Sequence, residues 1–227
     1  MEKFFIYKMN PEPLDLILFR GSDVISRTVE EAEQIGIGLS DYSHVGVIIS
    51  GEMLPNIKEL KKDVLYVWES TVNKNRYGVQ IRELNTVTEK YVGDIYLAKL
   101  ITNPWNFEVS LRSEIINKLI QFHEIFGRRT YEFSLFNLLA TIIPKLRWLR
   151  NEYDKISDFF TSGVRIGMEE CKKEWLFCSE LVVLLYKNLG IYPPEIDERD
   201  IAPVDFTGIR YPELNIFKDF VPMRRTR

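Results

Sequence analysis

The sequence is poor in the residues that most often carry chemistry, with 2 cysteines and 2 histidines among 227 residues. Cys171 and Cys178 lie close together in the chain, so they form no disulfide framework, and a metal cluster normally needs more ligands than these. Any imidazole chemistry must use His44 or His123. Because these histidines lie in unrelated segments, they do not show the ligand spacing of a zinc hydrolase. We therefore expect no metal, and two free thiols in a reduced, cytosol-like compartment.

Long apolar runs and a strong charge of either sign are also missing. No stretch approaches the ~18 apolar residues of a membrane span, and the N-terminal segment "MEKFFIYKMNPEPLDL" has no apolar core long enough for a signal peptide. These two features favour a cytoplasmic location. A net charge of −3 provides no strong basic field, so we expect no nucleic-acid partner. No glycine-rich phosphate loop is present, and we expect no organic cofactor.

Short apolar runs bounded by turn residues dominate the first hundred residues and predict strands. A Ser-Asp start and terminal glycines predict one helix, over 22–38. The turn residues of "NKNRYG" predict a hairpin. The predicted strands are 13–21, 43–50, 63–70, 78–84 and 93–100.

The second half of the chain changes to the period of a helix. Apolar residues recur on one face of 110–127 and of 178–190, and Gly127 and Gly190 supply the stops. The segment 134–160 is rich in large apolar residues and is interrupted by Pro144. Strands followed by helices predict an α+β protein in which an antiparallel sheet packs against helices. A length of 227 residues with 45% apolar residues suits a single domain over 1–227.

Cys178 stands at the predicted start of a helix, in the segment "EWLFCSELVVLLY". A helix N-terminus presents unpaired amides and a partial positive charge, which favour a thiolate and can also bind an oxyanion. Ser179 and Glu180 are residue types common in a first helical turn, so they need no catalytic explanation. The alternative is a structural cysteine, because free cysteine is among the residues most often buried for packing.

A cysteine nucleophile needs a base, and the base needs a group that orients it. His44 opens the apolar strand "SHVGVIIS", whereas His123 lies on an amphipathic helix and is expected to face solvent. Glu69 ends the apolar strand "VLYVWES", where its carboxylate needs a partner or water. A hydrogen-bonded core histidine and a solvated strand-end glutamate are the structural alternatives. Together, Cys178, His44 and Glu69 are the one Cys/His/acid set that the chain offers.

The segments that carry these residues resemble the permuted papain-like amidases of the YaeF/YiiX type, circularly permuted relatives of the NlpC-type cell-wall peptidases. The resemblance covers roughly 13–100 and 123–207, and "SHVG" followed by "FCSELV" is its most specific part. His44 precedes Cys178, as permutation requires. The quoted segments are "DLILFRG", "YSHVGVIIS", "VWESTVNKNRYGVQIREL", "FCSELVVLLYKNLG" and "IAPVDF".

The resemblance implies a circularly permuted papain-like fold and a cysteine amidase or peptidase-like hydrolase, with thiol-protease chemistry. It assigns Cys178 as the nucleophile, His44 as the base and Glu69 as the orienting acid. Tyr42, together with Ser179, is expected at the substrate site. The stretch "GRRTYEFS" departs from the family pattern, with Glu132 where aspartate is usual.

The segment 134–174 is longer and more apolar than a minimal domain of this family needs, and we expect a helical insertion or lid there. The resemblance implies a substrate with an amide or ester bond, which includes small molecules, peptides and lipids, and the reaction is hydrolysis or acyl transfer. Two alternatives stay open. One is a non-catalytic peptide- or lipid-binding module of the same fold. The other is a protein that binds a membrane surface or a partner through its apolar insertion.

Overall fold

The computed structural model describes residues 10–21, 42–73, 76–127, 176–208 and 211–224. Within these ranges the chain forms a six-stranded sheet in the order β4-β3-β2-β1-β5-β6, and every neighbouring pair is antiparallel. The strands are β1 Leu16–Gly21, β2 His44–Ser50, β3 Leu65–Asn73, β4 Arg76–Glu83, β5 Gly93–Leu100 and β6 Phe217–Arg224.

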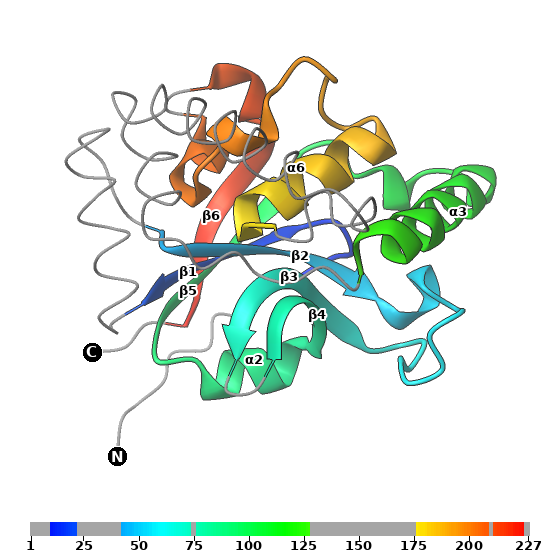
Figure 1. Cartoon of the computed structure of the whole chain (residues 1–227), viewed down its shortest axis with the longest axis horizontal. Helices are drawn as coiled ribbons and strands as arrows, with labels where there is room; N and C mark the ends of the chain where they lie inside the picture. The colour runs from blue at the N-terminus through cyan, green and yellow to red at the C-terminus, as the bar shows by residue number, and fades with distance from the viewer. Residues whose placement is uncertain (1–9, 22–41, 74–75, 128–175, 209–210, 225–227) are drawn as a thin grey trace, which may run out of the picture.

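Three α-helices lie in the described part of the chain: α2 Leu84–Lys90, α3 Val109–Phe126 and α6 Cys178–Leu189. Figure 1 shows α3 and α6 over one face of the sheet and α2 against the other. The predicted α+β class, with an antiparallel sheet packed against helices, is confirmed. None of these helices is long and apolar enough to cross a membrane.

All five predicted strands and the helices at 110–127 and 178–190 are confirmed, with bounds shifted by a few residues. The predicted hairpin joins β3 to β4, which pair as far as Asn73 and Arg76. Sequence reasoning missed α2, which is only seven residues long, and β6. The predicted helix at 22–38 and the predicted insertion at 134–174 lie outside the described residues.

Alternation along the strands divides the core into two layers. The larger layer packs the sheet against α3 and α6, and Val47, Trp68 and Leu181 are among its fully buried members. The smaller layer, which includes Ile17, Val67 and Val87, lies between the sheet and α2. Adjacent residues of one strand therefore reach different layers of the molecule.

Helix α6 is held at both ends. Gly190 adopts a left-handed conformation with φ 76° just after the helix and stops it. At the start, the Glu180 carboxylate accepts a hydrogen bond of 3.0 Å from the backbone N–H of Phe177. In the middle, the buried Tyr186 hydroxyl donates a 2.7 Å hydrogen bond to the carbonyl of Leu14 and so ties α6 to the segment before β1.

We expect Tyr186→Phe to lower the free energy of unfolding by about 1–3 kcal/mol, because it leaves the buried Leu14 carbonyl without this donor. Urea unfolding measures the change. Cys178 lies two turns earlier on α6, so its alkylation rate in the folded protein stays at the wild-type value. A wild-type stability would contradict the role of this hydrogen bond.

Candidate active site

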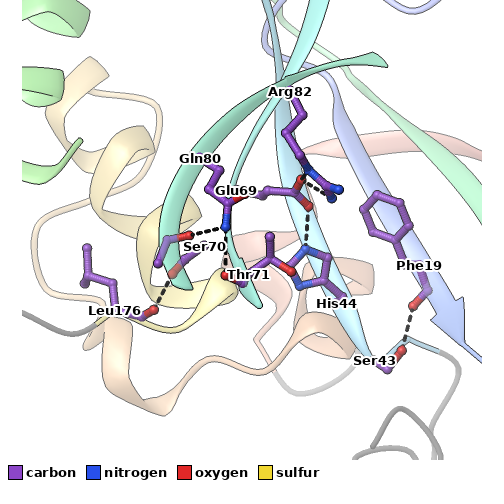
Figure 2. Close-up of polar contacts among 10 residues, drawn as sticks. Phe19, Ser43, His44, Glu69, Ser70, Thr71, Gln80, Arg82 and Leu176 are labelled. Carbon is purple, nitrogen blue, oxygen red and sulfur yellow. Dashed lines mark hydrogen bonds and ion pairs between the residues drawn. The ribbon is translucent and has the colours of Figure 1, made fainter. Parts of the chain in front are cut away.

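His44 and Glu69 come together at the boundary between β2 and β3. The ladder of paired residues between these strands ends at Val47 and Trp68, and His44 and Glu69 lie just beyond it. His44 Nε2 is 2.7 Å from Glu69 Oε2, in a hydrogen-bonded ion pair (Figure 2). The Glu69 side chain is fully buried, whereas 18% of the His44 side chain is exposed. The imidazole therefore connects a buried carboxylate to the surface.

Gly46 gives the Glu69 side chain its space. A Cβ atom at Gly46 would lie 3.2 Å from the Cβ of Glu69, 2.6 Å from Cγ1 of Val67 and 3.3 Å from the carbonyl oxygen of Trp68. These distances are too short for the strands to keep their spacing. Gly46 therefore allows β2 and β3 to approach closely beside the carboxylate that His44 binds.

Arg82 of β4 is the second partner of Glu69, and sequence reasoning missed it. Its Nε donates a 2.6 Å hydrogen bond to Glu69 Oε1, and its Nη2 lies 2.5 Å from the same oxygen. Arg82 pairs with Val67 across the β3–β4 ladder, so it lies diagonal to Glu69 on the same face. Gln80 and Arg82 alternate with apolar residues along β4, but only the register of β3 against β4 brings Arg82 beside this acid.

Cys178 is the first residue of α6, is 5% exposed, and lies near enough to His44 to influence the pKa of that imidazole. Because His44 Nε2 is bound to Glu69, Nδ1 is the nitrogen left for the cysteine. Burial alone would lower the pKa of His44. The charge and hydrogen bond of Cys178, followed by those of Glu69, outweigh burial and raise this pKa to about 10.

The Glu69 carboxylate keeps its negative charge despite complete burial. Burial alone would raise its pKa, but the hydrogen bond and charge of His44, and then those of Arg82, lower it below the ordinary value. An ionised Glu69 holds the proton on Nε2 and orients the ring. With its pKa raised to about 10, the oriented imidazole is protonated at neutral pH, which is the form that pairs with a thiolate.

Ser70 fixes the segment that leads into Cys178. Its buried hydroxyl donates a 2.5 Å hydrogen bond to the carbonyl of Leu176, two residues before the cysteine (Figure 2). Consecutive residues of β3 thus serve the two sides of the site. Glu69 binds the imidazole, and Ser70 binds the approach to α6.

The other candidate residues lie in distinct surroundings. Tyr42 is buried and its ring packs edge-on against Tyr96 at 5.3 Å between centroids. Ser179 is 2% exposed in the first turn of α6. His123, expected to face solvent, is half-buried, with its ring centroid 5.8 Å from that of Trp68. Cys171 and Glu132 lie outside the described residues.

The described residues contain no group of three or more His, Cys, Asp or Glu side chains that could hold a metal ion. The polar cluster around His44 has one side chain each of Cys, His, Glu and Arg. Its chemistry is that of a thiol, a base and an orienting ion pair.

Comparison with known proteins finds similarity in structure but not in sequence. No family model and no curated protein matches the sequence. A solved structure described as the metalloprotein YiiX from Escherichia coli O157:H7 overlays with a TM-score of 0.43 and 16% sequence identity. The overlay covers 79% of this chain and 66% of that chain, slightly less than two thirds of the neighbour's length. A similarity of this size assigns neither a family nor an activity to this chain.

The elevated pKa of His44 predicts a pH-dependent stability. The pKa of 6.5 for an unperturbed histidine rises to about 10 in the folded protein, so the stabilisation from the imidazolium is complete below pH 6.5. It is lost as the pH rises through about 10. Glu69→Gln removes a counter-charge and moves the His44 pKa back toward 6.5. Imidazole ¹⁵N chemical shifts, followed from pH 5 to 11 in the wild type and Glu69→Gln, measure both values. An unchanged titration in Glu69→Gln contradicts the coupling.

Gly46→Ala is expected to destabilise the fold by about 1–3 kcal/mol, because the added methyl group displaces the side chain of Val67 and the Cβ atom of Glu69. It also disturbs the His44 titration, since Glu69 moves relative to the ring. Gly190→Ala is the matched control. It has nothing within 4 Å of the new methyl group and carries only the strain of its positive φ. If both variants leave the His44 titration at the wild-type value, Gly46 does not set the position of Glu69.

Proposed function

We propose that the protein is a cysteine-dependent acyl-transfer enzyme, a hydrolase or acyltransferase that acts on an amide or ester bond. The observation that carries this proposal is the connected series from Glu69 through His44 to Cys178 at the start of α6. A thiol, an imidazole and a carboxylate linked in this order are the parts that nucleophilic catalysis needs. Burial and packing of Cys178 do not by themselves require a histidine that is held by a buried acid.

In the first half of the reaction, the Cys178 thiolate attacks the carbonyl carbon and a C–S bond forms. Backbone amides of the first turn of α6, including that of Cys178, stabilise the negative oxygen of the tetrahedral intermediate. His44 then donates its proton to the leaving amine or alcohol as the C–N or C–O bond breaks. A thioester on Cys178 remains.

In the second half, His44 takes a proton from water or from another acceptor as that group attacks the thioester carbon. The C–S bond breaks and the thiolate leaves, paired again with the imidazolium. Glu69 stays ionised throughout and holds the ring in one orientation. With water as the acceptor the enzyme is a hydrolase, and with an amine or alcohol it is an acyltransferase.

The order of these residues along the chain supports a circularly permuted papain-like fold as part of the same proposal. His44 and Glu69 come from two neighbouring strands that precede the nucleophile helix α6 in sequence. In an unpermuted papain-like chain the cysteine comes first. Tyr42 and Ser179 are proposed to contribute to the substrate site through their place beside His44 and Cys178 in the chain.

A panel of activated substrates tests the proposal without knowledge of the natural one. p-Nitrophenyl esters of short and long acids, amino-acid p-nitroanilides and a short-chain phosphatidylcholine are incubated with the protein, and intact mass is recorded. We expect an acyl adduct on Cys178 that hydroxylamine removes. Cys178→Ala abolishes the adduct, and His44→Ala slows its formation by about 10²-fold or more. Cys171→Ser is the control and leaves the adduct in place.

A folded protein that forms no adduct with any member of the panel, and whose Cys178 reacts no faster than a free thiol, contradicts the enzyme proposal. That result favours the binding module of the same fold. Flotation of the wild-type protein with liposomes then distinguishes a lipid-binding module from a peptide-binding one.

A further inference from the structure

The two oxygens of the Glu69 carboxylate are divided between two cations. Oε2 binds His44 Nε2 at 2.7 Å, and Oε1 binds both Nε and Nη2 of Arg82. Glu69 has no exposed surface, so water does not replace either partner. Each cation therefore limits which oxygen the other can reach.

Three adjacent strands supply one charged side chain each to this cluster: β2 His44, β3 Glu69 and β4 Arg82. Figure 2 shows the carboxylate between the imidazole and the guanidinium. The Arg82 side chain is 31% exposed, so its own charge is partly solvated while the charge of Glu69 is not. A partly solvated guanidinium can stabilise a buried carboxylate without itself bearing a full desolvation cost.

We propose that Arg82 is a positioning residue of the active site, which keeps Glu69 ionised and directs Oε2 toward His44. This inference rests on the proposed function. Arg82 does not touch the thiol and takes no part in bond making or breaking. It acts on the base through Glu69, and it adds a fourth residue to the proposed active site.

Charge alternates along this four-residue series when the thiol is ionised: Arg82 positive, Glu69 negative, His44 positive and Cys178 negative. Among the described residues, His44 and Arg82 are the charged groups that act on Glu69, and Glu69 and Cys178 are those that act on His44. Removing Arg82 leaves a net negative cluster if Glu69 stays ionised. If Glu69 takes up a proton instead, His44 loses its counter-charge. Both results disfavour the thiolate–imidazolium pair.

The test is the pH dependence of Cys178 alkylation by iodoacetamide, in the wild type, Arg82→Gln and Arg82→Lys. We expect Arg82→Gln to raise the pH at which the alkylation rate reaches half its maximum by about 0.5–1 pH unit. Arg82→Lys keeps the positive charge, so we expect its alkylation profile to stay close to that of the wild type. Arg112→Gln, whose guanidinium binds the carbonyl of Trp105, is the matched control and leaves the profile unchanged.

A second measurement keeps the proposal testable if Arg82→Gln does not fold. In the wild-type protein, the Arg82 Nε–H resonance is expected to shift with the same pH midpoint as the His44 imidazole, because both bind one carboxylate. A flat Arg82 resonance overturns the proposal, as does a folded Arg82→Gln variant with the wild-type profile.

The two levels of the proposal fail in different ways. If the wild-type profile depends on His44 and Arg82→Gln does not move it, Arg82 is only a structural partner of Glu69 and the proposed function stands. If the wild-type profile does not depend on His44, the proposed function itself fails.

Discussion

A fully buried carboxylate is the constraint on which the rest of this site depends. Glu69 has no contact with solvent and stays ionised only because His44 and Arg82 each bind one of its oxygens. Removing either partner would leave an uncompensated charge inside the protein, which is among the most destabilising changes a fold can suffer. The same ion pairs that make burial of Glu69 tolerable also orient the imidazole toward Cys178.

Strand β3 links the stability of the fold to the geometry of the site. Trp68 packs in the larger core layer, and Glu69, the next residue, faces the opposite side of the strand and binds His44. The Ser70 side chain, on the same face as Trp68, donates a hydrogen bond to the carbonyl of Leu176. Alternation along one strand thus positions the base and the approach to the nucleophile helix from a single rigid element. Gly46 on β2 completes the arrangement by leaving room beside the carboxylate.

The strands and two of the helices could be predicted because each has a strong local signal. Gly190 ends α6 as expected, and the β-branched run of β2 is unambiguous. Helix α2 was missed because seven residues are too few to show a helical period. Strand β6 was missed because it is far from β5 in the sequence and pairs with it irregularly. The sequence pointed to Cys178, His44 and Glu69 by residue type. It did not point to Arg82, because that ion pair depends on the register of β3 against β4.

The most direct test of the central claim is the rate of Cys178 alkylation against pH in the wild type and His44→Ala, with Cys171 as the internal control in the same molecule. We expect Cys178 to be alkylated faster than Cys171 at neutral pH in the wild type, because the His44 imidazolium beside it favours the reactive thiolate. We expect His44→Ala to remove this advantage while the rate at Cys171 is unchanged. Equal and slow reaction at both cysteines of the folded wild-type protein, in an accessible site, would contradict the account.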